Sequence, residues 1–312
     1  MDAPHHRKTS HEAVVRARPF DVYRLIEDVT RWPQMFPPTV HAERLEHHGD
    51  DERIGIWATV NDEVKSWTSR RRLDPDRLCI KFVQETPHHP LAAMGGSWVV
   101  EPLDEHLSRV RLLHDYRLVE DTADHREWIE RALDRNSDVE LAALKDRAEN
   151  QNSANDPLLT FCDTVEVPGS AEVAYAFLNE AQHWSRRLPH VTRVDLREYV
   201  PGVQILEMDT RTADGAAHTT RSIRVCKPNT LIAYKQTLLP AILTLHTGRW
   251  SLAETGTGLR VTSEHTAAVN PERIQEVLGA GTSLDKAKSF VRQVLSANSL
   301  ATLEHAKAYV SA

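Results

Sequence analysis

The chain has 312 residues, of which 40% are hydrophobic and 27% are charged, and its formal net charge at pH 7 is −7. This length suffices for two ordinary domains. The negative charge argues against a general nucleic-acid-binding protein, which normally carries a basic patch or stripe. The sequence has no apolar run long enough to cross a membrane, so no membrane association is expected.

The cysteines and histidines indicate in which cellular compartment the protein is expected and whether it binds a metal. Cys79, Cys162 and Cys226 are odd in number and far apart, without a CxxC pattern. They predict neither a disulfide framework nor a zinc knuckle, and they fit a reducing cytoplasm, as does an N-terminus with no signal-peptide pattern. The histidines form only short clusters, such as His47-His48, without metal-site spacing. We expect no metal site and no cofactor.

The first half of the chain reads as a strand, a short helix and then an antiparallel meander. Residues 11–18 alternate like a strand, and Pro19-Phe20-Asp21 opens a helix that we expect to end near Trp32-Pro33, because proline disfavours helix just before it. Six segments separated by turns then read as strands. They span residues 40–46, 54–60, 64–73, 78–85, 95–102 and 107–118.

A long amphipathic helix is predicted over residues 126–148. Its inward-facing residues are expected to be Ile129, Leu133, Val139, Leu141 and Leu144. Residues 150–157 are polar and rich in turn formers, which is typical of a linker. We therefore predict an N-terminal domain over residues 1–149 and a C-terminal domain over residues 158–312.

The second half repeats the pattern of the first, and internal repeats define domain organisation. The matching pairs follow one another in the same order with slowly drifting spacing. They are Trp32 with Trp184, Asp74-Pro75 with Lys227-Pro228, Gly96-Ser97-Trp98 with Gly248-Arg249-Trp250, His114 with His265, and Asn136-Ser137 with Asn298-Ser299. We expect two homologous domains.

The stretch Trp67-Thr68-Ser69-Arg70-Arg71 is the most informative in the chain. Alternate residues of a strand share a face, so Trp67, Ser69 and Arg71 point the same way. An inward-facing arginine needs an acidic partner or a wet cavity, because burying an unpaired charge is costly. Either Arg71 pairs with an acid and Trp67 is part of the core, or both line a cavity.

The second copy keeps part of this face. Thr220, Ser222 and Arg224 occupy the matching positions, so the serine and the arginine are retained and the tryptophan is lost. Each domain is therefore predicted to be α+β, with an antiparallel curved sheet wrapped around a long C-terminal helix. Such a fold leaves a cavity between sheet and helix, where ligands usually bind.

This order of elements resembles the helix-grip fold of the START and Bet v1-like superfamily. The segments Trp32-Pro33-Gln34-Met35-Phe36-Pro37 and Trp67-Thr68-Ser69-Arg70-Arg71 further resemble the aromatase/cyclases of bacterial type II polyketide synthases, including the tetracenomycin aromatase/cyclase. Two departures from the tetracenomycin enzyme are Pro38-Thr39, where it has a pocket tyrosine, and Lys65, where it has a tryptophan. A mechanism that uses that tyrosine does not carry over.

The resemblance implies an enzyme that closes and aromatises the first ring of a poly-β-ketone chain already reduced once by a ketoreductase. The implied partners are an acyl carrier protein that presents the chain and other subunits of the synthase. The family's pocket roles fall on Arg71, Ser69, Trp67 and Trp32.

The chemistry of these residue types agrees with ring closure. Arg71 is a fixed cation with planar donors that suits an enolate or alkoxide, and Ser69 adds a hydrogen bond. Dehydration needs a proton donor, for which a relayed water or His114 is the candidate. Flat walls for the chain are expected from Trp32, Trp67, Trp98 and, in the second domain, Trp250, with Ser222 and Arg224 as further substrate contacts.

Other interpretations of the same residues stay open at this stage. The alternative for His114 is a core or rim residue whose hydrogen bonds are all made within the protein. Trp98 is alternatively part of the core packing, and Trp32 alternatively covers the end of the helix. For the whole chain, the alternatives are a non-catalytic carrier of a hydrophobic ligand and an assembly subunit with vestigial pockets. The doubled Ser-x-Arg pattern favours the enzyme, because a lipid carrier needs mostly apolar walls whereas a poly-β-ketone calls for hydrogen-bond donors.

Overall fold

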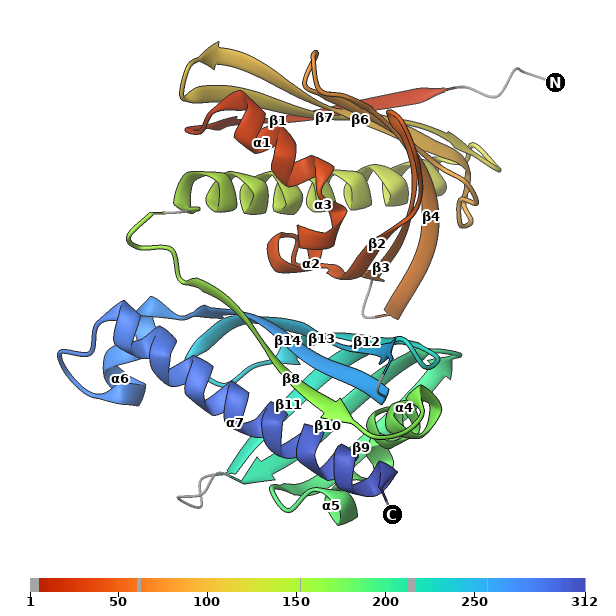
Figure 1. Cartoon of the computed structure of the whole chain (residues 1–312). Coiled ribbons are helices and arrows are strands. Elements are labelled where there is room, and N and C mark those ends of the chain that lie inside the picture. The colour runs from red at the N-terminus through yellow and green to blue at the C-terminus, as the bar shows by residue number, and fades with distance from the viewer. Residues whose placement is uncertain (1–5, 61–62, 152, 212–216, 257, 312) are drawn as a thin grey trace. The chain divides into compact units, whose positions relative to one another are not determined.

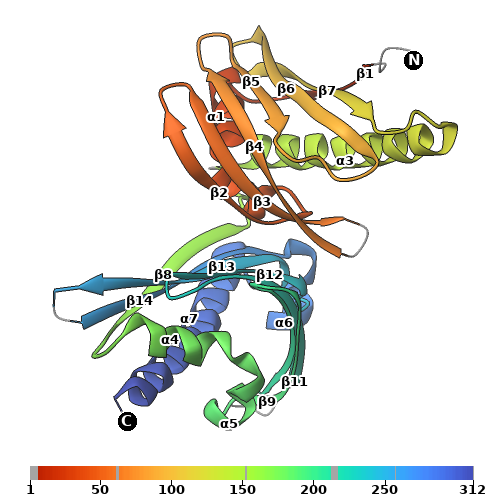
Figure 2. The same cartoon turned by 90° about the vertical axis from the view of Figure 1, so that its right-hand side faces the viewer.

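The computed structural model describes residues 6–60, 63–151, 153–211, 217–256 and 258–311. The chain divides into two compact units, one reaching Ala154 and the other beginning at Asn155, which places the division inside the predicted linker. Each unit is a seven-stranded antiparallel sheet with a long helix across one face (Figures 1 and 2).

The N-terminal unit follows the predicted order of strand, short helix, meander and long helix. Its elements are β1 (Arg7–Val15), α1 (Pro19–Glu27), η1 (Val29–Arg31), α2 (Trp32–Met35), β2 (Thr39–His48), β3 (Asp51–Val60), β4 (Glu63–Asp74), β5 (Cys79–Gln84), β6 (Leu91–Asp104), β7 (Leu107–Leu118) and α3 (Ala123–Asn150). The strands pair in the order β1-β7-β6-β5-β4-β3-β2.

The C-terminal unit repeats this arrangement with two short helical segments added before its long helix. Its elements are β8 (Leu158–Val167), α4 (Ala171–Asn179), η2 (Ala181–His183), α5 (Trp184–Arg187), β9 (Val191–Val200), β10 (Val203–Arg211), β11 (Ala217–Lys227), β12 (Leu231–Leu238), β13 (Leu243–Thr255), β14 (Gly258–Val269), η3 (Pro271–Arg273), α6 (Ile274–Leu278) and α7 (Leu284–Val310). The strand order β8-β14-β13-β12-β11-β10-β9 is equivalent to that of the first sheet.

Two local predictions were wrong. The first helix ends at Glu27 rather than near Trp32-Pro33, because the Asp28 side chain accepts a hydrogen bond from the Thr30 amide and starts a new turn. Pro33 instead stands in the first turn of α2, where its missing N–H has no helical partner to lose. Val139 does not face inward: it is 39% exposed on the outer side of α3.

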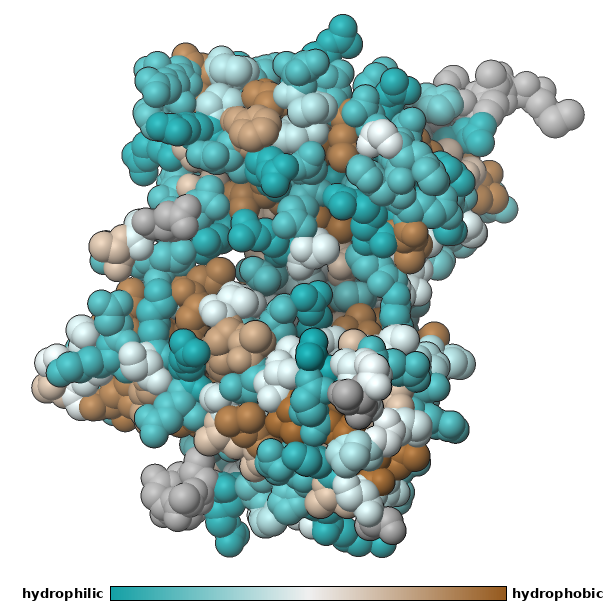
Figure 3. Space-filling view, viewed as in Figure 1, coloured by the Kyte–Doolittle hydropathy of each residue, from teal (hydrophilic) through white to brown (hydrophobic). Residues whose placement is uncertain are grey.

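The core of each unit lies between its sheet and its helices. In the N-terminal unit, Leu141 and Leu144 of α3 pack with residues of α1 and of the central strands, such as Val22 and Ile80. In the C-terminal unit, Leu303 of α7 belongs to the equivalent cluster. Figure 3 shows mainly hydrophilic residues on the visible face of the N-terminal unit and a mixture of hydrophilic and hydrophobic residues on that of the C-terminal unit. Among the residues that the structure describes, no helix is long and apolar enough to span a membrane.

Since each unit has buried clusters of its own, each should fold without the other. We expect chains of residues 1–154 and 155–312 to be soluble and to unfold cooperatively, as measured by circular dichroism during heating. The full chain is the reference. Two halves that stay unfolded both alone and when co-expressed would contradict independent domains.

Candidate active site

A cavity of about 630 Å³ lies inside the N-terminal unit, between the sheet and α3. Its walls come from β2 to β7, from α2 and from one side of α3. The wall is mostly apolar but includes several polar and charged side chains, among them Lys65, Glu63 and Gln84. This combination of apolar walls and a few polar groups is typical of small-molecule sites.

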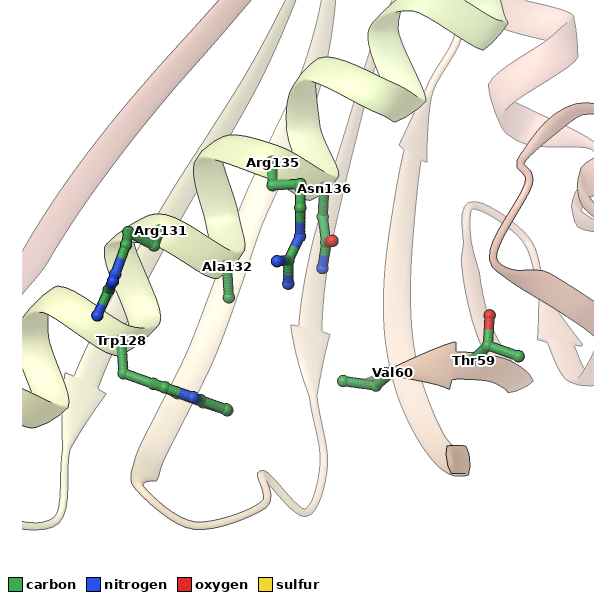
Figure 4. Close-up of a pocket in the computed structure, with 7 residues that line it drawn as sticks. All are labelled: Thr59, Val60, Trp128, Arg131, Ala132, Arg135 and Asn136. Carbon is green, nitrogen blue, oxygen red and sulfur yellow. The ribbon is translucent and has the colours of Figure 1, made fainter. Parts of the chain in front are cut away.

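A hollow between the tip of β3 and α3 adjoins the cavity, and we call it the mouth because five of its lining residues also line the cavity (Figure 4). Thr59 and Val60 come from β3, and the facing residues come from successive turns of α3. The α3 residues of this mouth are Trp128, Arg131, Ala132, Arg135 and Asn136. Arg131 and Arg135 are exposed, so the mouth carries positive charge although the chain as a whole is negative.

The structure brings six of the nine residues predicted for the site together in this cavity. They are Trp32, Trp67, Ser69, Arg71, Trp98 and His114. The alternation of β4 explains the grouping, because Trp67, Ser69 and Arg71 share its inner face. The other three, Ser222, Arg224 and Trp250, are buried in the C-terminal unit and line no part of it.

Arg71 is almost fully buried and is held by three groups. Its Nε lies 3.0 Å from a carboxylate oxygen of Glu52 in an ion pair, and Glu52 is itself buried. Its two terminal nitrogens donate hydrogen bonds to the main-chain oxygens of Ile26 and Glu27, at 3.2 and 2.9 Å. The interpretation in which Arg71 pairs with an acid is therefore confirmed, and it does not exclude the cavity, which Arg71 also lines.

These contacts tie the middle of β4 to the C-terminal end of α1. A helix leaves its last carbonyl groups without intrahelical partners, and a cation there is favourable. The Trp32 indole also donates to the Ile26 oxygen, at 3.2 Å, and its ring lies 5.3 Å from the Arg71 guanidinium. Burial lowers the pKa of Arg71 to about 10, so the guanidinium stays charged at neutral pH.

The C-terminal unit contains a second version of this arrangement. Arg224 donates to the Leu178 oxygen at 2.6 Å and lies 5.4 Å from the Trp184 ring. The position that matches Glu52 is Gln204, which hydrogen-bonds Glu198 at 2.9 Å. The arginine contact with a helix end is thus common to both units, whereas among the residues that the structure describes a buried carboxylate pairs with Arg71 and none pairs with Arg224.

His114 lines the cavity from β7. Its ring packs edge-on against Phe82, with 5.7 Å between centroids, and its Nδ1 has no hydrogen-bond partner among the described residues. Burial lowers the pKa of His114 to about 4, so the imidazole is neutral at pH 7. The buried Ser137 hydroxyl, also in the cavity wall, likewise lacks a partner in the described part of the chain. A polar ligand would satisfy both atoms.

Sequence reasoning missed Glu140, which lines the cavity from α3. Burial raises the pKa of its carboxyl group to about 7. The signal that could have found it is the helical phase: Asn136 and Glu140 are four residues apart and share a face. The inward-facing residues predicted for this helix instead included the apolar Val139.

The interior of the C-terminal unit differs from the cavity at four matching positions. Phe82, Met94, Leu112 and His114 correspond to Tyr234, His246, Ser263 and His265. Nδ1 of His265 lies 3.0 Å from both the Tyr234 hydroxyl and Nε2 of His246, and the Ser263 hydroxyl lies 3.1 Å from Nε2 of His265. These polar groups contact one another, so this interior is not a copy of the N-terminal cavity.

No group of three or more His, Cys, Asp or Glu side chains within the described ranges could hold a metal ion. The three cysteines are free thiols.

Comparison with known proteins agrees with this geometry. The profile of a family described as polyketide cyclase/dehydrase and lipid transport matches residues 15–136. A granaticin polyketide synthase bifunctional cyclase/dehydratase from Streptomyces virginiae is 44% identical, covering 95% of this chain and 97% of its own. An actinorhodin polyketide synthase bifunctional cyclase/dehydratase from Streptomyces coelicolor is 43% identical, covering 99% and 98%.

A solved structure, that of the di-domain ARO/CYC BexL from the BE-7585A biosynthetic pathway, superposes with a TM-score of 0.92. Its sequence is 49% identical, over 98% of this chain and 99% of that one. The chain therefore belongs to the polyketide cyclase/dehydratase family, in its two-domain form. The predicted family and the helix-grip fold are confirmed, and the full-length relatives favour the enzyme over the carrier.

The buried ion pair gives a stability prediction. Glu52→Ala would leave the Arg71 charge buried without its counter-ion, so we expect the N-terminal unit to lose about 3–5 kcal/mol of unfolding free energy in urea titrations. Glu52→Gln should cost less, because Gln204 stands at this position beside Arg224. The control is Glu46→Ala, since Glu46 pairs with Arg53 near the surface and its loss should cost about 1 kcal/mol or less. Equal losses of unfolding free energy for Glu52→Ala and Glu46→Ala would contradict a stabilising role of the buried Arg71–Glu52 pair.

Proposed function

We propose that the N-terminal cavity holds a poly-β-ketone chain, directs the aldol closure of its first ring and dehydrates the product to an aromatic ring. The observation that supports this most is the composition of the wall. Trp32, Trp67 and Trp98 offer flat surfaces for a folded chain, and Ser69 and Arg71 offer hydrogen-bond donors. A poly-β-ketone has a carbonyl at alternate carbons and uses both kinds of contact.

Arg71 is proposed to stabilise the oxyanion that forms during ring closure. A guanidinium has five N–H groups, and one on each terminal nitrogen of Arg71 donates to Ile26 or Glu27, while Nε lies in the ion pair with Glu52. The other N–H group on each terminal nitrogen remains for an enolate or alkoxide oxygen. A donor fixed in advance by these contacts needs no reorganisation when the charge develops, which makes it effective in a site that excludes water.

Ser69 and His114 are proposed to assist. Ser69 lies one pleat from Arg71 on the same face and can donate to a second substrate oxygen. A neutral imidazole is a poor proton donor, so for His114 we favour a hydrogen bond to a carbonyl over the proton delivery predicted from sequence. Substrate contact by Ser222, Arg224 and Trp250 stays a prediction, as does the cytoplasmic location.

The two copies allow a test with a built-in control. We expect Arg71→Ala to abolish correct first-ring formation and Arg224→Ala merely to reduce it, because Arg224 is not in the cavity. The loss for Arg71 should be on the order of 10²–10³ in rate, as for other oxyanion donors. The assay combines a minimal polyketide synthase, a ketoreductase and each variant, and identifies the first-ring and shunt products.

Folding must be controlled, since Arg71→Ala removes the hydrogen bonds to the end of α1 and leaves the buried Glu52 with Arg44 as its remaining ion-pair partner. Arg71→Lys keeps a positive charge beside Glu52, so this variant should fold. Lysine lacks the planar guanidinium group, so the variant should still form little of the correct first-ring product. If folded Arg71→Lys and Arg71→Ala both give the native product while Arg224→Ala does not, the chemistry resides in the C-terminal unit.

We also propose that the substrate arrives on an acyl carrier protein whose arm enters through the mouth shown in Figure 4. Such an arm carries a phosphodiester, and Arg131 and Arg135 are suited to bind it. Arg131 has an exposed ion pair with Glu127, which is weak enough to exchange.

Charge reversal at the mouth should therefore weaken the carrier interaction. For the Arg131→Glu/Arg135→Glu variant we expect KM for carrier-bound substrate to rise about tenfold or more with kcat little changed, because a hydrogen bond to a charged group contributes about 1.5–3 kcal/mol. The control is Arg77→Glu, an exposed arginine beyond the other end of β4. An equal effect of both reversals would indicate long-range charge alone.

A further inference from the structure

One side of α3 faces the cavity between Trp128 and Glu140. The cavity-lining residues recur every three or four positions, which is the spacing of one helix face. They are Trp128, Ile129, Ala132, Leu133, Asn136, Ser137 and Glu140. Trp128 also belongs to the mouth, whereas Glu140 does not, and the next residue, Leu141, is packed in the core. Glu140 is therefore the inner end of this stripe.

The Glu140 carboxylate has no hydrogen bond or ion pair with any described residue. Charged and titratable side chains face the same cavity from the strands and from the segment before β6, and none of them pairs with it. They are Glu63, Lys65, Arg71, His88, His89 and His114. Removal from water without a counter-charge raises the pKa of Glu140 to about 7, so both protonation states are present at neutral pH.

Glu140 offers what the predicted site residues lack. Arg71 keeps its proton, and the neutral His114 has no proton to give as an acid near pH 7. Ring closure needs a group that removes a proton from carbon and another, or the same group, that delivers one to oxygen. A carboxyl group that exists in both states serves both steps.

We propose that Glu140 is the catalytic proton carrier of this site, an inference that rests on the proposed function. In the aldol step its carboxylate removes the proton from the attacking carbon, and the enolate forms a bond to the ketone carbon. The carboxylic acid then returns that proton to the alkoxide. In dehydration the carboxylate takes the proton from the neighbouring carbon and gives it to the departing hydroxyl, so a C–H and a C–O bond break, a C=C bond forms and water leaves.

The experiment compares wild type, Glu140→Gln, Glu140→Asp and Asp138→Asn in the reconstituted assay from pH 6 to 8.5. Asp138 is an exposed carboxylate on the same helix and serves as the matched control. Product ratios are normalised to a mixture without this protein. Binding of 1,8-dihydroxyanthraquinone, measured by tryptophan fluorescence, reports on the cavity separately.

We expect Glu140→Gln to slow first-ring formation by about 10²-fold or more, the range of general acid–base catalysis. Wild-type activity should fall as the pH drops below about 7, where the carboxylate is lost, and this dependence should be absent from Glu140→Gln. Glu140→Asp should recover part of the rate, and Asp138→Asn should match wild type. Dye affinity should be unchanged in all variants.

Stability provides a readout that needs no substrate. A carboxyl group whose pKa is raised on folding contributes stability below its unfolded pKa, near 4.3, that is lost as pH rises toward about 7. At pH 8 the folded state therefore holds an unfavourable charge on the half-buried Glu140. Glu140→Gln removes that charge, so it should melt at the same or a higher temperature than wild type at pH 8.

The outcomes separate this inference from the function it rests on. If wild type itself yields no first-ring product over the mixture without it, the proposed function fails. If wild type is active and Glu140→Gln matches it at every pH, Glu140 is not the proton carrier. Loss of dye binding together with product in Glu140→Gln would also overturn the inference, because Glu140 would then be a binding residue.

Discussion

The N-terminal unit depends on a buried cation that joins the sheet to the end of a helix. Arg71 reaches from β4 to the last carbonyl groups of α1, and Glu52 balances its charge from β3. A buried pair of this kind contributes little net stability compared with apolar residues but is costly to break. It holds the end of α1 against β4, and Trp32, which donates to the same Ile26 oxygen, lines the cavity beside it. The same guanidinium faces the cavity, so one contact both shapes the site and supplies its charge.

The two copies show how one architecture takes different interiors. Arg224 keeps the contact with a helix end, so that contact belongs to the fold. What distinguishes the N-terminal copy is a carboxylate beside its arginine and apolar residues such as Phe82 and Met94 around the cavity. The C-terminal copy has Tyr234 and His246 there, joined through His265. A cluster whose polar groups contact one another offers few of them to a ligand.

Most of the fold could be predicted from the sequence because its periodicities are strong. The alternation of β4 placed Ser69 and Arg71 on the inner face, and the repeat gave two copies of one topology. The partner of Arg71 could not be found this way, because Glu52 lies on another strand whose register is set by sheet pairing. Main-chain carbonyl groups such as that of Ile26 leave no side-chain signal. Glu140 was missed because hydrophobicity alone selected Val139 for the inner face.

The central claim is that ligand binds in the N-terminal cavity, and ligand-induced quenching of tryptophan fluorescence tests it most directly. Trp67 lines this cavity, whereas Trp250 is buried in the C-terminal unit. Titration with 1,8-dihydroxyanthraquinone should quench the wild type, and Trp67→Phe should lose part of that quench while Trp250→Phe retains it. An unchanged quench in Trp67→Phe together with a diminished one in Trp250→Phe would place the ligand in the other unit.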